Sequence, residues 1–438
     1  MELKELMKNA GIVGAGGAGF PSYAKLSEGA DTLIINGSEC EPLLYTDFTI
    51  LSREMSFVIS GITLILENTG IHSAKLCIKD HTANSLSLSD GDTLANGVTV
   101  KLLRSSYPAG DEVSLIYEAT GRLVRPGALP ITKGVIVYNV ETVYNLGRAV
   151  RLGESVHRKW VTVGGDVESP RVVTVPVGTR VKDLLSSLSI KIKEDQTVLD
   201  GGPSMGKIIN PETEVVTKTT KAIIVLPRSS RAAESKRINP ALASSRAETA
   251  CCQCTRCTDM CPRHLLGYPL EPHKMVRTAM QAAVTLPNLV ISATLCCGCG
   301  ICENLACSQG ISPKAVINGY KELLAKNKMR YSTNFDVEPR VERDYRIIPT
   351  KKWAEALGIA RFDKKPEYAG ILDNFSRIEI PLKSHIGAPS IPTVSDGDIV
   401  RRGDIIAKAA DGLSVPQHAS LDGKITLSGD RIIIDRID

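Results

Sequence analysis

The sequence predicts a multidomain protein of mixed α/β and α+β class. Its 438 residues suffice for two to four domains at roughly 100 to 200 residues each. Up to about residue 150, short β-branched runs alternate with helical stretches, whereas the later chain changes to Val- and Thr-rich strands, a cysteine-rich region and strands with Gly turns. These changes of pattern predict separate structural units rather than one continuous sheet.

The first unit is expected to be a layered α/β domain over residues 1–155. Strands are predicted at 32–36, 75–78 and 135–138, and a helix is predicted at 53–68. Alternation of strands with helices is typical of a sheet that is covered by helices.

The second unit, residues 158–228, is expected to be a small α+β domain. Its predicted strands are 161–163, 172–175 and 223–225, and its one helix is 181–188. The Ser-, Ala- and Arg-rich segment 228–246 has little apolar periodicity, which is typical of a linker or an exposed helix.

Two further units complete the chain. The cysteine-rich region over 247–330 has a helical pattern at 272–283. The segment 375–438 returns to short strands, with tight-turn signals at 396–398 and 422–423.

Composition and charge argue against several classes of function. Lys and Arg total 53 against 48 Asp and Glu, and this net charge of +5 comes without a block of five like charges, so nucleic-acid binding is not expected. The N-terminus has no continuous apolar region, and the longest apolar stretch, 57–66, is about half of what spans a bilayer. We expect a cytoplasmic protein without a transmembrane segment, and a peripheral role at a membrane stays open.

The cysteines carry the most specific signal, because ten of the twelve fall between residues 251 and 307. One run, C-x2-C-x2-C-x3-C-P, is the pattern by which bacterial ferredoxins hold a [4Fe-4S] cluster with three thiolates while the fourth ligates a neighbouring cluster. A second run has the spacing C-x2-C-x2-C-x4-C. We therefore assign one cluster to Cys251, Cys254, Cys257 and Cys307, and the other to Cys296, Cys299, Cys302 and Cys261.

Zinc is the alternative, because Cys254-x2-Cys257 and Cys299-x2-Cys302 could form one all-thiolate site, but it leaves the other four periodic cysteines unexplained. Cys252 and Cys297 are one residue out of register, so they are free thiols or substitutes for a ligand. Cys77 is expected in a hydrophobic core.

A glycine-rich loop, Gly14-Ala15-Gly16-Gly17-Ala18-Gly19, formally matches G-x-G-x-x-G. The dinucleotide-binding version needs a strand before it and a helix after it, but here the preceding segment is helical in period and Phe20-Pro21 follows. Glycines still let the backbone approach a phosphate or a flat ring, and Lys25 could supply a counter-charge. The alternative is a flexible surface loop.

Four segments then carry a family resemblance: residues 14–25, 36–42, 107–112 and 139–142. In this order they resemble the FMN- and NADH-binding subunit of respiratory complex I, and still more the C subunit of the Rnf complex. Over nearly the whole chain the sequence is most similar to the cobalamin reductases of propanediol-utilisation microcompartments, including Cys261-Pro262-Arg263-His264 and Ile311-Ser312-Pro313.

The resemblance implies a Rossmann-like domain that binds FMN noncovalently and receives hydride from NADH, followed by a helical ferredoxin-type domain with two [4Fe-4S] clusters. Carried over to this sequence, it places the FMN phosphate at Gly14, Gly16, Gly17, Gly19 and Lys25. It places flavin-ring and ribityl contacts at Asn36, Glu39, Glu41, Tyr107, Gly110, Glu112, Asn139 and Thr142. Carboxylates such as Glu39 and Glu112, the expected catalytic residues, can orient ribityl or nicotinamide-ribose hydroxyls.

The sequence departs from the family patterns at two places. Ser22-Tyr23 replaces a Thr-Gly pair, which affects how the nicotinamide enters, and Ser308 replaces the proline after the last cysteine, which affects a cluster potential.

The remaining units resemble two known modules. Residues 160–227 resemble a soluble-ligand-binding β-grasp domain, which either docks a ligand or spaces the flavin from the clusters. The C-terminal segment resembles a barrel-sandwich hybrid of the biotinyl and lipoyl type, but 415–419 (Val-Pro-Gln-His-Ala) replaces the carrier lysine, so no covalent arm is expected. His418 is either a corrinoid ligand or a surface or packing residue. His264 is expected to hydrogen-bond a cluster sulfur.

The leading hypothesis is an NADH-dependent cobalamin reductase, in which FMN and two clusters pass electrons to a corrinoid. The alternatives are a peripheral electron-entry subunit of a membrane Rnf-type complex, whose acceptor is a protein, and a scaffold with structural clusters. The C-terminal position of the barrel-sandwich module favours the first, because the Rnf subunit carries it at its N-terminus. Expected partners are NADH, a corrinoid, an adenosyltransferase, and a microcompartment shell or protein acceptor, with location in the cytoplasm or inside a microcompartment.

Overall fold

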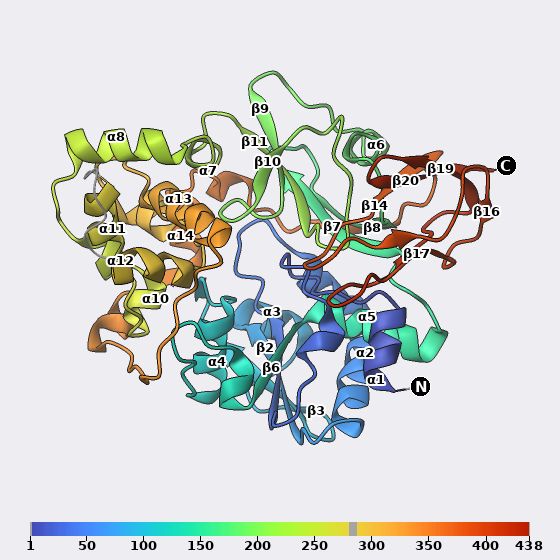
Figure 1. Ribbon diagram of the computed structural model, residues 1–438, viewed down its shortest axis with the longest axis horizontal. Coiled ribbons are helices and arrows are strands. Elements are labelled where there is room, and N and C mark those ends of the chain that lie inside the picture. The colour runs from blue at the N-terminus through green and yellow to red at the C-terminus, as the bar shows by residue number, and fades with distance from the viewer. Residues whose placement is uncertain (1, 280–286, 438) are drawn as a thin grey trace.

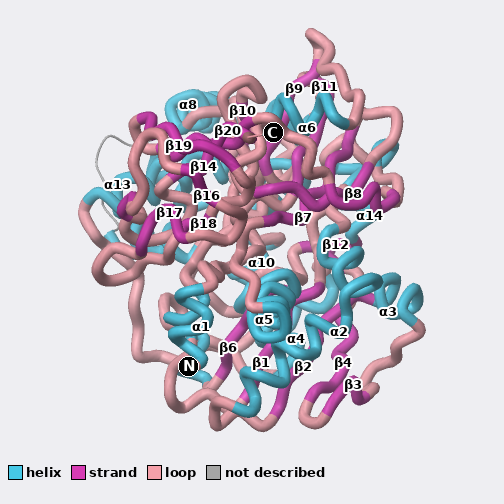
Figure 2. Tube along the Cα trace, turned by 90° about the vertical axis from the view of Figure 1, so that its right-hand side faces the viewer, coloured by secondary structure: helices cyan, strands magenta, loops and turns pink. Residues whose placement is uncertain are grey.

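The computed structural model describes residues 2–279 and 287–437 (Figure 1). An α/β domain lies at the bottom of this view, a strand-rich region lies above it, the cysteine-rich helices lie on the left, and the C-terminal strands lie on the right. Figure 2, turned by 90°, shows the same division between the α/β lower part and the strand-rich upper part.

The N-terminal domain is built on a five-stranded sheet of order β3-β4-β2-β1-β6. Its strands are β1 (Thr32–Gly37), β2 (Ser73–Lys79), β3 (Thr93–Ala95), β4 (Val98–Leu103) and β6 (Val135–Asn139). β1 pairs in parallel with β2 and β6, and β2 pairs in parallel with β4. The predicted strands in this domain are confirmed.

The helices cover both faces of this sheet. They are α1 (Leu3–Asn9), α2 (Thr46–Glu67), α3 (Asp80–Leu86), α4 (Glu112–Thr120) and α5 (Val140–Leu152). Leu33 and Ile35 share a core with α2 and α5, whereas Ile34, between them in β1, shares a core with α4 and with residues of the cysteine-rich region. This alternation is the period-two pattern of a strand buried on both faces.

Helix α2 begins at Thr46, before the predicted start at residue 53, and has a kink at Glu54. By length and composition it could cross a bilayer, and it is the one such helix among residues 2–279 and 287–437. In the structure, α2 packs closely on α5, where a Cβ at Gly61 or Gly147 would collide with the backbone of the other helix. Helix α2 is therefore a core helix of this domain.

The second sheet has six strands in the order β10-β9-β11-β7-β8-β13. They are β7 (Arg158–Gly165), β8 (Arg171–Pro176), β9 (Gln196–Asp200), β10 (Lys207–Ile209), β11 (Ala222–Pro227) and β13 (Glu367–Ile371), with helix α6 (Val181–Ser187). The predicted strands and helix of this unit are present. Strand β13 comes from far along the chain and was not predicted, because its pairing with β8 is a long-range contact.

The cysteine-rich region is helical. Its helices are α7 (Arg231–Ser235), α8 (Pro240–Ala250), α9 (Arg256–Asp259), α10 (Pro262–Leu265), α11 (Pro272–Ala279), α12 (Pro287–Ile291) and α13 (Pro313–Lys326). Segment 228–246 thus holds helix rather than an irregular linker. The predicted helix 272–283 is seen as α11 to Ala279, and residues 280–283 lie outside the described residues.

After α13 the chain returns to the other domains. Strand β12 (Ile348–Pro349) pairs with β5 (Ser106–Tyr107) of the first domain, and helix α14 (Thr350–Ala356) follows. The last strands are β14 (Arg377–Pro381), β15 (Ile391–Pro392), β16 (Ile399–Val400), β17 (Ile405–Lys408), β18 (Gln417–His418), β19 (Gly423–Ser428) and β20 (Arg431–Arg436). They form two small sheets that share one hydrophobic core with β7 and β8.

Strand β18 and the residues before it are buried where three domains meet. Lys218 Nζ donates to the carbonyl oxygens of Gly11 and Pro416, each at 3.0 Å. A Cβ at Gly19 would lie 2.8 Å from Thr219, so the glycine loop also touches this junction. His418 is 4% exposed. The segment that corresponds to a carrier hairpin is therefore packed inside, and His418 is a packing residue rather than a surface residue.

Acidification is expected to weaken this junction. Burial, and then the charge of Lys218, lower the pKa of His385 to about 4 and the pKa of His418 to about 3. An unfolded chain takes up these protons near pH 6.5, but the folded chain does not, so stability falls as the pH decreases from about 6.5 toward 4. At pH 5 we expect a loss on the order of 1 to 2 kcal/mol per histidine.

The measurement is the urea midpoint of the holoprotein at pH 7.5 and pH 5. His418→Gln should reduce the difference between the two midpoints, whereas His72→Gln, at an exposed histidine of the first domain, should leave it unchanged. An equal pH dependence in all three proteins would contradict the prediction.

Candidate active site

The glycine-rich loop lies over the carboxyl ends of β1 and β6. The loop connects α1 to a short 3-10 helix (Ser22–Lys25). It does not connect a strand to a helix, and this agrees with the prediction from its sequence context. Asn36 is the last residue of β1 that pairs with β6, and its register partner is Asn139, whose Nδ2 donates to the Asn36 carbonyl at 3.2 Å. A Cβ at Gly16 would lie 3.5 Å from the Cβ of Asn139. This is the edge at which parallel sheets bind ligands.

The other family motifs meet at the same edge. The backbone N–H of Ala15 donates to Thr142 Oγ1 at 3.1 Å, and Asn36 Nδ2 donates to the Gly110 carbonyl at 3.1 Å. A Cβ at Gly110 would lie 2.6 Å from Ser38 Oγ and 3.0 Å from Cys40 Sγ, so only glycine fits this approach. The glycines leave the backbone accessible beside the strand ends that carry Asn36 and Asn139. A ligand with a flat ring and a phosphate group suits such a surface.

Lys25 and Glu112 form an ion pair beside this edge. Lys25 Nζ lies 3.0 Å from Glu112 Oε1 and also donates to the Val137 carbonyl at 3.1 Å. The side chains are 32% and 41% exposed, so a ligand could reach both. An anion that binds Lys25 would share the positive charge of its ammonium group with the Glu112 carboxylate.

The Glu39 carboxylate caps helix α2. Its oxygens accept hydrogen bonds from the backbone N–H groups of Asp47, at 2.9 Å, and Phe48, at 3.0 Å. Burial, and then the nearby Asp47 carboxylate, raise the pKa of Glu39 to about 7. A carboxylate at a helix N-terminus is stabilised by the orphan N–H groups, and this cap explains why α2 starts before its predicted first residue.

The Glu41 carboxylate holds the second domain. It accepts from the backbone N–H groups of Ser204, at 2.7 Å, and Met205, at 2.8 Å. Both predicted acidic contacts of the flavin, Glu39 and Glu41, thus have backbone partners of their own.

A buried charge network lies behind the glycine loop, and sequence reasoning did not identify it. Lys221 pairs with Asp47 and lies 3.7 Å from Glu141, and Lys159 pairs with Glu141. Lys159 Nζ also donates to the Ala15 carbonyl at 3.2 Å, so the charge network is bonded to the backbone of the glycine-rich loop. The one feature of the sequence that could have indicated this network was the presence of Glu141 in the fourth family motif.

Tyr107 lies on the side of the first domain that faces the cysteines. Its hydroxyl donates to the Cys299 carbonyl at 2.7 Å, and its ring stacks on Trp353 with centroids 4.6 Å apart. Arg263, directly after Cys261-Pro262, donates to Asp111 at 2.7 Å, and Asp111 is flanked by Gly110 and Glu112. The last cysteine of the first run and the second run are therefore both bonded, through Arg263 and Cys299, to the edge of the flavin motifs.

The cysteines line two separate cavities. One is lined by Cys251, Cys252, Cys254, Cys257 and Cys307, and the other by Cys261, Cys296, Cys297, Cys299 and Cys302. Each cavity thus combines three cysteines of one run with the last cysteine of the other run. The two cysteine pairs of the zinc alternative line different cavities, so the structure does not bring them together as that site requires.

Four thiols around one cavity are the donor set of a [4Fe-4S] cluster. Burial raises the pKa of Cys257 to about 12, and it raises the pKa of Cys261 further. Thiolates at such positions need a nearby cation, which iron supplies.

Cys77 is fully buried, as predicted, whereas Cys40 packs in one cluster with Tyr107 and Cys299. His264 Nδ1 lies 3.1 Å from the carbonyl of Leu270, and a hydrogen bond from His264 to a cluster sulfur stays a prediction.

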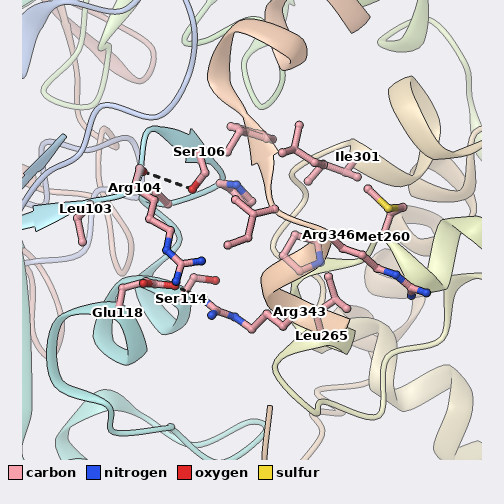
Figure 3. Close-up of a pocket in the computed structure, with 16 residues that line it drawn as sticks. Leu103, Arg104, Ser106, Ser114, Glu118, Met260, Leu265, Ile301, Arg343 and Arg346 are labelled. Carbon is pink, nitrogen blue, oxygen red and sulfur yellow. Dashed lines mark hydrogen bonds and ion pairs between the residues drawn. The ribbon is translucent and has the colours of Figure 1, made fainter. Parts of the chain in front are cut away.

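A third cavity of about 60 Å³ marks the seam between the first domain and the cysteine-rich region (Figure 3). In Figure 3, Arg343 points toward Glu118, with which it forms an ion pair. Met260, Leu265 and Ile301 of the cysteine-rich region line the opposite side. The seam is therefore held by charged pairs as well as by apolar packing.

Three family models match this chain. Residues 7–148 match the Nuo51 FMN-binding domain, residues 250–312 match the 4Fe-4S dicluster domain, and residues 370–434 match the RnfC barrel sandwich hybrid domain. The mixed α/β architecture with these three domains is thus confirmed.

Full-length relatives are also found. The chain is 35% identical to cobalamin reductase PduS of Salmonella typhimurium, over 99% of this chain and 96% of the relative. It is 36% identical to cobalamin reductase PduS of Citrobacter freundii, over 97% and 94%. The C subunit of the Na(+)-translocating ferredoxin:NAD(+) oxidoreductase complex of Acetobacterium woodii is 29% identical over 60% of this chain and 58% of its own length.

Among solved structures, a chain of an NAD+-reducing [NiFe]-hydrogenase in the H2-reduced state matches with a TM-score of 0.45 and 21% identity, covering 76% of this chain and 63% of that one.

Proposed function

The chain belongs to the cobalamin reductase PduS family, and from this premise we propose how it carries electrons from NADH to a corrinoid. It is an oxidoreductase with an FMN-binding domain and a 4Fe-4S dicluster domain. When bound, FMN would supply the link between two-electron hydride chemistry and one-electron transfer, and each cluster would supply a one-electron carrier.

The observation that carries the proposal is the order of the three sites. Arg263–Asp111 and Tyr107–Cys299 bond two residues that line the cavity of Cys261, Cys296, Cys299 and Cys302 to the flavin domain. Cys252 and Cys254 of the first run are exposed. The cavity of Cys261, Cys296, Cys299 and Cys302 would therefore hold the cluster next to the flavin edge, and the cavity of Cys251, Cys254, Cys257 and Cys307 would hold the cluster nearer to the acceptor.

The chain's residues hold the flavin at the edge of the first sheet. Gly14, Gly16, Gly17, Gly19 and Lys25 take the phosphate. Asn36, Gly110, Asn139 and Thr142 contact the ring and the ribityl chain, and Glu112 orients the nicotinamide ribose. Glu39, Glu41 and Tyr107 frame this site by fixing α2, the second domain and the cysteine-rich region.

We assign the domains as residues 1–155, 158–228, 247–330 and 375–438. The parallel strands of the first sheet support a Rossmann-like description, and the second sheet with α6 supports a β-grasp description. Location inside a microcompartment, and partners such as an adenosyltransferase, a shell protein or a protein electron acceptor, stay predictions from the family resemblance.

The experiment that tests the function is an anaerobic assay of the purified, reconstituted protein with NADH. Cobalamin, ferredoxin and viologen dyes are compared as acceptors. We expect reduction of cobalamin, whereas efficient reduction of ferredoxin without cobalamin reduction would favour the Rnf-type alternative.

In the same assay, Glu112→Gln should raise the KM for NADH about tenfold while flavin per chain is retained. An amide still hydrogen-bonds but carries no charge, and a bond to a charged group contributes about 1.5 to 3 kcal/mol. Glu28→Gln, at an exposed glutamate of the same domain, is the control. An unchanged KM in Glu112→Gln would remove Glu112 from the NADH site.

A further inference from the structure

The largest of the cavities described lies outside the flavin edge and the two cysteine cavities. It has a volume of about 480 Å³ and is formed by α7, α8 and residues of the segments 303–307 and 310–312. Its lining residues are Arg231, Glu234, Ser235, Arg237, Ile238, Leu242, Arg246, Glu303, Asn304, Cys307, Gly310, Ile311 and Ser312. Helices α7 and α8 lie at the upper left in Figure 1, away from the first domain. We call this cavity the α7–α8 groove.

The groove adjoins the cavity that Cys251, Cys254 and Cys257 line. Cys307 and Ile311 line both of them. Cys307 is the thiol that we assign to the cluster of the first run. Because electron transfer slows steeply with distance, a molecule in the groove would be well placed to receive an electron from that cluster.

Three arginines give the groove a positive character. Within the described part of the chain, their guanidinium groups donate to backbone carbonyls: Arg231 to Asn304 at 2.9 Å, Arg237 to Arg228 at 2.9 Å, and Arg246 to Gly310 at 3.4 Å. Among the residues that the structure describes, none of the three lies within ion-pair distance of a carboxylate.

The lining contains two acidic residues, Glu303 and Glu234. Glu303 forms an ion pair with Lys314 at 3.5 Å, so Glu234 is the one remaining negative charge beside the three positive charges of the arginines. The groove therefore carries positive charge that no carboxylate of the described chain neutralises.

Part of the remaining lining is apolar and open. Leu242 is 42% exposed, and Ile238 and Ile311 lie beside it in the same lining. A concave site of this size, with apolar walls and a few charged groups, suits a small molecule rather than a flat protein surface.

We propose that the α7–α8 groove binds the corrinoid acceptor, with the arginines on its anionic phosphodiester and amide carbonyls and the apolar side chains against the edge of the macrocycle. The proposal rests on the function proposed above, which supplies the corrinoid. Guanidinium groups recognise phosphate and carbonyl oxygens in a fixed, often bidentate geometry. The electrons balance because one NADH gives NAD+, one proton and two electrons, and each electron reduces one Co(III) centre to Co(II).

Arg237→Glu is the sharpest test, because the Arg237 guanidinium bonds the carbonyl of Arg228 rather than the backbone around the cysteines. We expect the KM for hydroxocobalamin to rise about tenfold or more, as for the loss of a charge-assisted bond to phosphate. Reduction of a viologen dye in the same preparation is the internal reference. Arg237→Lys should restore most of the affinity, and Arg401→Glu, at an exposed arginine of the C-terminal domain, is the matched control.

Cobinamide separates the phosphodiester from the rest of the corrinoid, because it lacks the nucleotide and its phosphodiester link. The wild type and Arg237→Glu should differ less with cobinamide than with hydroxocobalamin. Should Arg237→Glu lose iron, Arg237→Gln replaces it in the same comparison.

The outcomes distinguish the two proposals. A wild-type protein that reduces the dye but no corrinoid overturns the proposed function and this site with it. A wild-type protein that reduces hydroxocobalamin with the same KM as Arg237→Glu overturns the groove alone and leaves the function standing.

Discussion

Replacing Gly17 by valine is expected to give a protein that contains iron at the wild-type level but no flavin, and that does not oxidise NADH with any acceptor. Gly17 has a φ of +110°, and no atom lies within 4 Å of the position that a Cβ would occupy. A side chain there would stand on the open side of the loop, where the phosphate or the ring is proposed to lie. The cysteines that hold the clusters belong to a different part of the chain, so the iron content should persist.

Gly29→Val is the matched control for this variant. Gly29 also has a positive φ, +86°, with no atom within 4 Å of a Cβ, and it lies in the same domain outside the glycine loop. It therefore carries a similar backbone cost without blocking the proposed site. Flavin per chain, iron per chain and NADH-dependent dye reduction are measured for both. Full flavin occupancy in Gly17→Val, or equal flavin loss in both, would show that the loop does not hold FMN.

The second large effect concerns the crossed cysteines. Cys261→Ser should remove the cluster of the cavity that contains Cys296, Cys299 and Cys302, and Cys307→Ser should remove the cluster of Cys251, Cys254 and Cys257. Each variant is expected to lose about four of eight irons, because a cubane cluster holds four. Anaerobic iron analysis and EPR spectra measure the loss and identify the remaining cluster.

The two variants should also differ in electron transfer. In Cys307→Ser the remaining cluster lies beside the flavin domain, so NADH should still reduce it, whereas reduction of cobalamin should fall by orders of magnitude. In Cys261→Ser the remaining cluster is separated from the flavin edge and should not be reduced by NADH. Cys252→Ser, which lines the first cavity but is not an assigned ligand, is the control. The crossed ligation would be contradicted if each variant lost the cluster held by the other three cysteines of its own run.

Local patterns in the sequence were enough to predict much of the fold. The strands at 32–36, 75–78 and 135–138 were predicted correctly because a buried strand needs a short run of β-branched and aliphatic residues, wherever its partners lie. The two cysteine runs could also be recognised from the sequence, since two-residue gaps between cysteines are a property of the chain itself.

Long-range partners were decided only by the tertiary structure. Glu39 and Glu41 have the same side chain, and the sequence cannot distinguish a carboxylate that binds a hydroxyl of a cofactor from one that caps α2 or holds the backbone of Ser204. The pairing of β13 with β8 and the burial of His418 depend in the same way on groups far along the chain.

The connection between the flavin edge and the second cysteine cavity has the same origin. Arg263 and Asp111 are far apart in sequence, and neither residue predicts the other. Hydrophobic periodicity and ligand spacing are local properties, so the sequence by itself predicted most of these elements and the eight cysteines that we propose as metal ligands. Hydrogen bonds and ion pairs between distant segments form only when packing brings their partners together, so the structure alone decided that Glu41 bonds Ser204 and that Arg263 bonds Asp111.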